Sequence, residues 1–248
     1  MNKIKKLIKS NDRVKQHGEV FTPDWMVQKM LDIPEIKNAT ESYTKTFLEP
    51  AAGDGNFLVA ILERKLASVK KEFLNKTLIE YESHALYALS TLYGIELLED
   101  NAQMCAMNLA TTFQKEYLEV VQLFHGEAND DVIKSANYII SKNIVNGNFL
   151  TRKDRIGDPI TFTEWEVCEV TPLGELVVSQ TDYTLDEIYD NADHQKGTMN
   201  DYPKFYEEYD LFADYDFGEE IDVSFDKYGY AEVVISKVYK EEIEYYDN

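Results

Sequence analysis

The stretch Phe47-Leu48-Glu49-Pro50-Ala51-Ala52-Gly53-Asp54-Gly55-Asn56-Phe57 decides the fold of this 248-residue chain. Apolar residues lead into an acid and a proline, two glycines follow with one residue between them, and an apolar pattern of helical period begins at once. Glycine lets the backbone turn sharply and lets a ligand approach the main chain. The helix N-terminus beyond it offers unpaired N–H groups and a partial positive charge. The stretch therefore predicts a buried strand, a ligand-binding loop and a helix.

A second strand is expected over residues 92–97, where the short apolar run Leu92-Tyr93-Gly94-Ile95 ends in the acid Glu96. In nucleotide-binding α/β sheets an acid at this place receives the ribose hydroxyls, because a carboxylate accepts two hydrogen bonds at once. The usual gap from the glycine loop to this acid is about 20 residues. An additional helical stretch over 78–92 accounts for the longer gap here. The alternative to a ribose-binding Glu96 is a glutamate that ends the strand and is exposed to solvent.

A third strand is expected at Asn143-Ile144-Val145, followed by Asn146-Gly147-Asn148-Phe149-Leu150. Upstream of the glycine loop, the run 17–23 ends in Phe21-Thr22-Pro23, and an apolar helical pattern follows. Thr22 is suited to cap that helix with Pro23 at its first position. Three strand–helix units with loops at the carboxyl ends of the strands predict a doubly wound sheet that binds its ligand there.

In this order the four motifs resemble those of the S-adenosylmethionine (SAM)-dependent DNA adenine-N6 methyltransferases of the restriction–modification kind. The resemblance covers about residues 17–150 and implies an α/β, Rossmann-like methyltransferase fold with a partly parallel sheet. It also implies SAM as cofactor, DNA or a DNA-processing protein as partner, and a place as a restriction–modification subunit. The implied cofactor-binding residues are Phe21, Thr22, Pro23, Glu49, Pro50, Ala51, Gly53, Gly55, Asn56, Phe57, Glu96, Leu97, Asn148 and Phe149.

The resemblance also implies roles for individual residues. The Phe21-Thr22-Pro23 segment closes over the methionine end of SAM, and Glu96 receives the ribose. Asn148 offers its carbonyl to the adenine amino group, at a place where the family commonly has Asp, and Phe149 packs on the adenine ring. No metal site is expected.

The catalytic tetrapeptide of that family, Asn/Asp/Ser-Pro-Pro-Tyr/Phe/Trp, has no counterpart, because no two of the six prolines are adjacent. Its acceptors hold the amino group of a flipped adenine. The expected place, 151–160, is charged and holds only Asp158-Pro159-Ile160, so Asp158 is the one candidate for a catalytic residue. Asn200-Asp201-Tyr202-Pro203 contains similar residues in another order.

The formal charge of −21 is unevenly distributed. Residues 181–248 carry 20 Asp and Glu against 5 Lys and Arg, whereas residues 1–16 are basic. A DNA-binding surface needs clustered Lys and Arg. The acidic, tyrosine-rich end is a solvated surface on one interpretation. On the other, it mimics DNA or docks a nucleic-acid enzyme, and the chain is then a non-catalytic binding module derived from a methyltransferase.

We therefore predict a basic segment over 1–16, a methyltransferase-like domain over 17–150 and an acidic, β-rich or mixed appendage over 151–248. Short, half-exposed antiparallel strands are expected at 160–167, 176–178, 221–225 and 231–235. The region 114–141 is expected to be loose. No apolar run approaches the length that spans a bilayer, and two cysteines without metal-ligand spacing favour a reducing, cytoplasmic location. Whether the chain methylates DNA, and at which sequence, does not follow from these patterns.

Overall fold

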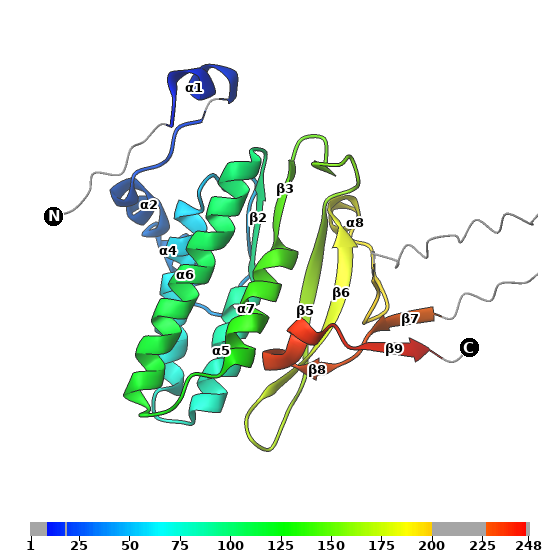
Figure 1. Ribbon diagram of the computed structural model, residues 1–248. Helices are drawn as coiled ribbons and strands as arrows, with labels where there is room; N and C mark the ends of the chain where they lie inside the picture. Colours follow the sequence, from blue (N-terminus) through cyan, green and yellow to red (C-terminus); the bar gives the residue numbers. More distant parts are fainter. Residues whose placement is uncertain (1–8, 18, 200–226, 247–248) are drawn as a thin grey trace, which may run out of the picture.

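A computed structural model describes residues 9–17, 19–199 and 227–246 (Figure 1). Its first sheet has the order β1-β2-β3-β4, made of β1 (Phe47–Glu49), β2 (Leu92–Glu96), β3 (Ile144–Asn148) and β4 (Lys153–Asp154). The first three strands are parallel and β4 is antiparallel to β3. The chain is thus a mixed α/β protein with a partly parallel sheet, and the three expected strands are confirmed.

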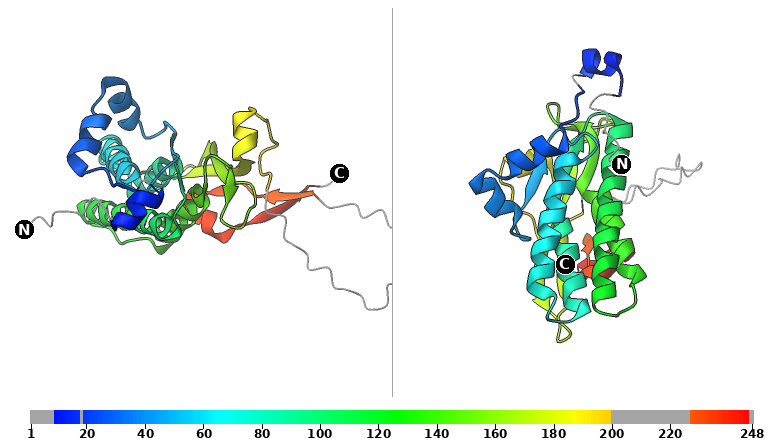
Figure 2. Two further views of the ribbon diagram at one scale, coloured as in Figure 1. Left: turned by 90° about the horizontal axis from the view of Figure 1, so that it is seen from above. Right: turned by 90° about the vertical axis from the view of Figure 1, so that its left-hand side faces the viewer.

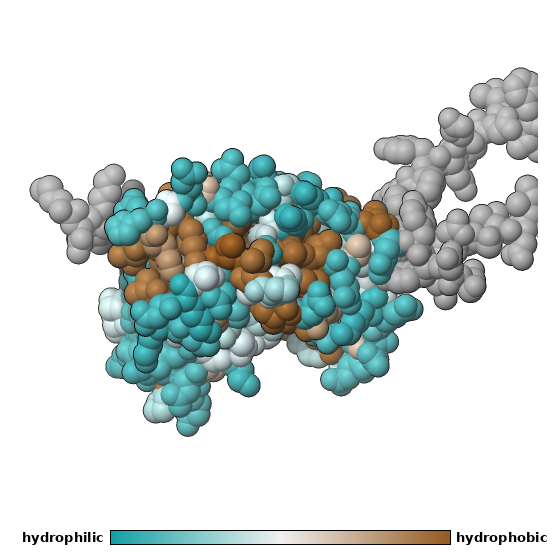
Figure 3. Space-filling view, turned by 90° about the horizontal axis from the view of Figure 1, so that it is seen from below, coloured by the Kyte–Doolittle hydropathy of each residue, from teal (hydrophilic) through white to brown (hydrophobic). Residues whose placement is uncertain are grey.

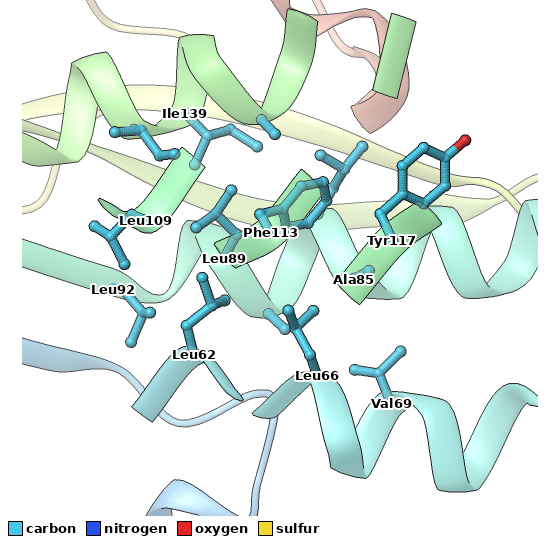
Figure 4. Packing of buried hydrophobic residues seen from close by; sticks show 14 of the residues in the cluster. Leu62, Leu66, Val69, Ala85, Leu89, Leu92, Leu109, Phe113, Tyr117 and Ile139 are labelled. Atoms are coloured by element: carbon cyan, nitrogen blue, oxygen red, sulfur yellow. The ribbon is translucent and has the colours of Figure 1, made fainter. Parts of the chain in front are cut away.

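Helices α4 (Asn56–Phe73) and α5 (Leu78–Ser90) connect β1 to β2, and α6 (Glu99–Leu123) and α7 (Asp130–Asn143) connect β2 to β3. Figures 1 and 2 show these four helices packed together beside the strands. Their apolar faces meet in one core, shown in Figure 4 by residues such as Leu62, Leu89 and Phe113. The expectation of a loose region over 114–141 is wrong, because α6 continues to Leu123 and α7 buries Val132, Ala136, Ile139 and Ile140.

The two faces of the parallel sheet are covered differently. Leu92 lies in the large helical core, whereas Ile95 belongs to a small cluster with Ile160, Phe162 and Leu185. Leu185 begins the short helix α8 (Leu185–Tyr189), which lies apart from the four long helices (Figure 2). In the described part of the chain the sheet therefore has long helices on one face only, whereas the doubly wound sheet that the sequence predicts has helices on both faces.

The region after residue 150 contains a second sheet of β5 (Thr161–Val170), β6 (Leu176–Thr184) and β8 (Val233–Val234), all antiparallel. A separate pair joins β7 (Lys227–Tyr230) and β9 (Ile243–Tyr246), and the 3-10 helix η1 (Ile235–Lys240) follows β8. The strand expected over 221–225 lies outside the described residues. The antiparallel arrangement is confirmed.

The described part of the C-terminal region is packed into the main core. Trp165, Val178 and Ile235 share one hydrophobic cluster with helices α4 to α7. Strand β6 is buried from Leu176 to Asp182, so its expected half-exposed character is wrong. Two of its buried polar residues accept side-chain hydrogen bonds, since Tyr138 donates to Gln180 Oε1 and Thr163 donates to Asp182 Oδ1 at 2.6 Å. The domain boundary at residue 150 remains a prediction from sequence, and the hydrophobic packing continues across it.

Before the first sheet come α1 (Asn11–His17), α2 (Asp24–Leu31) and α3 (Pro34–Thr40). Helix α2 is capped at Pro23, whose carbonyl accepts the N–H groups of Met26 and Val27, and no side chain caps it. The expected Thr22 cap is therefore wrong by one residue. Pro23 has extended dihedral angles, with φ −68° and ψ 148°, so it precedes the helix instead of opening it.

The outer surface is mixed in character. Seen from below, hydrophobic residues form a band across the middle of the molecule, bordered by hydrophilic residues (Figure 3). No helix among the described residues is long and apolar enough to cross a bilayer.

Candidate cofactor-binding site

The loop between β1 and α4 has the geometry that its glycines require. Gly53 and Gly55 have φ of 57° and 89°, a region that other residues rarely adopt. A Cβ atom on Gly55 would lie 2.9 Å from Cys105 Sγ in α6. A Cβ atom on Gly53 would lie 3.6 Å from the ring of Phe21. The loop is therefore held between α6 and the Phe21 segment with no room for a side chain at Gly55.

Hydrogen bonds between side chains and backbone groups fix this loop. Asn108 Nδ2 donates to Asp54 O at 2.8 Å, and the N–H of Ala51 donates to Glu49 Oε1 at 3.2 Å. Asn56 Nδ2 donates to Thr22 O at 3.2 Å, which ties the Phe21-Thr22-Pro23 segment to the start of α4. A loop fixed in this way is preorganised, so a ligand would not have to order it.

Glu96 joins the ends of β1 and β2. Its Oε2 accepts the N–H of Gly53 at 2.8 Å, and its Oε1 accepts the N–H of Leu98 at 3.0 Å and Asn101 Nδ2 at 3.4 Å. The side chain is 7% exposed. Because a carboxylate has about four lone-pair positions, Glu96 can hold the loop and still accept a hydrogen bond from a ligand.

A cavity of about 440 Å³ opens at the carboxyl ends of the three parallel strands. Its volume falls within the usual range for small-molecule sites. Eight of the expected cofactor-binding residues line it, namely Phe21, Pro50, Ala51, Gly53, Glu96, Leu97, Asn148 and Phe149. The structure thus brings together residues that lie about 130 positions apart in the sequence.

The other six expected residues, Thr22, Pro23, Glu49, Gly55, Asn56 and Phe57, are not among those that line the cavity. Three of them hold the loop in place through the contacts described above, namely Glu49, Gly55 and Asn56. Phe57 packs against the main core. Their direct contact with a cofactor remains a prediction.

Asn148 is used differently from our expectation. Its Oδ1 accepts the N–H groups of Leu150 at 2.9 Å and Thr151 at 3.3 Å. Both lone pairs of this oxygen are therefore engaged in a turn, and it is not free for an adenine amino group. Since both partners are N–H donors, the amide orientation is fixed, and the side chain presents donor hydrogens on Nδ2 instead.

Asp158 lies in the turn that follows β4, and its side chain is exposed. Its N–H donates to Asp154 Oδ1 at 2.9 Å, and its carbonyl accepts the N–H of Asp154 at 2.8 Å. It is not among the residues that line the cavity. The structure therefore gives Asp158 a place in a turn and none beside the cofactor loop.

Six lining residues were not singled out from the sequence: Glu19, Val20, Leu98, Asn101, Gly147 and Leu150. Glu19 is the most informative, because its Oε2 accepts a hydrogen bond from Arg13, while its buried Oε1 has no hydrogen-bond partner among residues 9–17, 19–199 and 227–246. A buried acceptor without a partner is costly, so a ligand donor at Oε1 would relieve that cost. The sequence signal was only that Glu19 lies two residues before Phe21.

Helix α1 is held beside the cavity by ion pairs. Arg13 and Lys9 both bind Asp100 in the first turn of α6, and these hydrogen bonds lower the pKa of that carboxyl far below its usual range. Lys9 Nζ also donates to Asn101 Oδ1 and lies 5.8 Å from the centre of the Phe21 ring. The described part of the basic N-terminal segment thus lies against the start of α6 and the Phe21 segment.

Burial, together with nearby carboxylates such as Asp54, raises the pKa of Cys105 to about 12. The thiol is therefore protonated at neutral pH and acts as a packing residue against Gly55 instead of as a nucleophile. Among the described residues, no group of three His, Cys, Asp or Glu side chains lies close enough to hold a metal ion.

Comparison with known protein families found a match. The model of the family described as N-6 DNA methylase matches residues 6–146. No curated protein and no solved structure shows a significant match. The matched region includes the Phe21 segment, the glycine loop and Glu96, and it spans more than half of the chain. The chain therefore belongs to the N-6 DNA methylase family.

Proposed function

We propose that this chain binds SAM in the cavity beside the glycine loop and serves in the methylation of adenine in DNA. The single observation that carries the proposal is a preorganised cavity of about 440 Å³ in which two buried carboxylates face the ligand space. When bound, SAM would supply the methyl group from its sulfonium.

The charge of the cavity suits that ligand. Glu19 and Glu96 line it, and none of the described Lys, Arg and His residues does. SAM carries positive charge on its sulfonium and its α-ammonium, so carboxylates favour it over a neutral or anionic ligand. The unpartnered Oε1 of Glu19 is suited to accept a hydrogen bond from the ammonium or from a hydroxyl, and Glu96 is suited to the ribose.

The shape also suits an adenosine. Phe149 and Phe21 line the cavity and offer aromatic faces, and Asn148 Nδ2 offers donor hydrogens to ring nitrogens. The chain's own residues would thus bind and orient the cofactor and exclude water from it. The amine acceptors that hold a target adenine are not provided by a Pro-Pro motif in this chain. We propose that they come from a restriction–modification partner.

The alternative of a DNA-mimicking module has no observation in its favour. Half of the acids of residues 181–248 lie within 200–226, which are outside the described residues. The mimic therefore remains a prediction from composition alone.

Titration calorimetry with SAM tests the proposal. Wild-type protein should release heat, and Gly53→Trp, which fills the space beside Phe21, should release none. Glu19→Gln should bind SAM about 10- to 100-fold more weakly, because a charged hydrogen bond contributes about 1.5–3 kcal/mol. Absence of heat with the wild type would refute cofactor binding.

Two controls sharpen the result. Glu99→Gln removes a carboxylate that is exposed at the start of α6 and does not line the cavity, so it should leave binding unchanged. S-adenosylhomocysteine lacks the sulfonium charge, so wild-type protein should prefer SAM over it. Transfer of labelled methyl to DNA, with and without candidate partners, then separates binding from methylation.

A further inference from the structure

Strand β1 is the open edge of the first sheet. Among the described residues it pairs with β2 only. The N–H of Phe47 donates to Thr91 O at 2.9 Å, so Phe47 and Glu49 direct their backbone groups toward β2. Because neighbouring residues of a strand direct these groups to opposite edges, the N–H and C=O of Leu48 point away from the sheet. Such an edge can accept a further strand.

Each face of this edge has its own groove, and Leu48 lines both. On the helical face a cavity of about 210 Å³ lies between β1, α2 and α4, with Met30, Phe47 and Phe57 in its wall. On the other face a cavity of about 660 Å³ is lined by Tyr93, Phe162 and Trp165. Side chains of an added strand would alternate between the two faces. A cavity of about 150 Å³ holds a benzene-sized group, so both grooves can take side chains.

The apolar character of the edge supports the same conclusion. Leu48 is 42% exposed, and Met30, which lines the smaller groove, is 45% exposed. Exposed apolar residues along an unprotected edge are avoided in monomeric proteins, which place charges or proline there. An apolar segment that covers them would remove this surface from water.

The charges around the edge indicate what kind of segment fits. The acids Glu49, Glu164 and Asp193 line the two grooves, and within the part of the chain that the structure describes no Lys, Arg or His lines either of them. A basic, apolar segment is therefore attracted. The acidic 200–226 stretch of this chain and a second copy of β1, which brings another Glu49, are repelled.

We propose that β1 accepts a parallel strand from a partner protein, a segment with apolar residues at alternate positions and Lys or Arg at its ends. In this direction its carboxyl end would lie beside Pro50 and Ala51, which line the cofactor cavity. The partner strand would thus extend the sheet at the place where doubly wound sheets continue into their second half. This inference does not require that the cavity binds SAM.

The test uses full-length protein and a synthetic peptide of nine residues, with valine at alternate positions, threonine between them and lysine at both ends. Hydrogen exchange of the Leu48 amide should slow at least tenfold when the peptide binds, because this N–H points to the open edge. In a Trp25→Phe background Trp165 is the remaining tryptophan and lines the larger groove, so the intensity of its emission should change when the peptide binds. An otherwise identical peptide with aspartate at both ends should bind at least tenfold more weakly.

Leu48→Lys places a charge at the edge and should abolish both signals, while the heat of SAM binding stays as in the wild type. Leu173→Lys is the matched control, since Leu173 is 64% exposed and lines neither groove. The proposal is overturned if the Leu48 amide is not protected or if both peptides bind equally. It is also overturned if sedimentation shows a wild-type dimer that Leu48→Lys dissociates, because the occupant is then a second copy.

Discussion

Replacing Lys65 by methionine should remove most of the dependence of stability on pH between pH 7 and 9. Lys65 lies in α4 and is fully buried. Its Nζ donates to the carbonyls of Ser42 and Lys45 and to Thr91 Oγ1, so it joins the residues that precede β1 and β2. These partners are neutral, and burial lowers the pKa of Lys65 to about 7.

The direction and the size of this pH dependence follow from the difference in proton binding between the folded and the unfolded chain. An unfolded lysine has a pKa of about 10.4, so between pH 7 and 10 the unfolded chain binds more protons at this site than the folded chain. The free energy of unfolding therefore rises with pH in this window. The slope approaches about 1.4 kcal/mol per pH unit. The gain between pH 7 and 9 amounts to about 2 kcal/mol.

Urea unfolding at pH 6, 7, 8 and 9, followed by circular dichroism, measures this effect. The difference between the wild-type and Lys65→Met free energies should grow by about 2 kcal/mol from pH 7 to 9, because contributions of other groups cancel in the difference. Lys71→Met replaces an exposed lysine on the same helix. For this variant the difference from the wild-type free energy of unfolding should not change with pH. If the difference for Lys65→Met does not change with pH either, Lys65 is not a buried, largely neutral amine.

Two further predictions concern packing and hydrogen bonding. Gly55→Ala should lower the free energy of unfolding by about 1–3 kcal/mol more than Gly157→Ala, because both glycines have positive φ but only a Cβ at Gly55 would overlap Cys105. Chemical unfolding of the two variants measures the gap, and equal losses would contradict the close contact. Tyr117→Phe should cost about 1–3 kcal/mol, since the hydroxyl donates to Glu82 Oε1 at 2.5 Å. Burial already raises the pKa of Glu82 and that hydrogen bond opposes the shift, so the loss should be larger at pH 7 than at pH 5; a loss independent of pH would argue against a charged Glu82.

The loop and its acid could be predicted because their signals are local. Gly53 and Gly55 have positive φ, which glycine adopts more readily than other residues. Glu96 directly follows the apolar residues of its strand. Helix α7 also carried a local signal that we missed, an Asn129 cap whose side chain accepts the N–H of Asp131, followed by apolar residues at helical spacing. The turn-forming residues at 125–130, which stand directly before that spacing, favour a loop instead.

Other features of the site could not be read from the sequence. The role of Asn148 depends on the turn at Leu150 and Thr151, which uses the oxygen that we assigned to a ligand. The burial of β6 depends on partners from α7 and β5, such as Tyr138 and Thr163. A polar residue in a strand is compatible with exposure or with a paired interior, and only its neighbours decide.

The sequence by itself determined the glycine loop, the order of the strand and helix units and the membership in the N-6 DNA methylase family, because each rests on residues that are close together in the chain. Only the tertiary structure decided that Glu19 faces the cavity with a free oxygen and that one face of the sheet lacks long helices in the described part of the chain. It also decided that Leu48 stands at an open edge between two grooves. These properties depend on which distant segments come into contact, and local patterns do not contain that information.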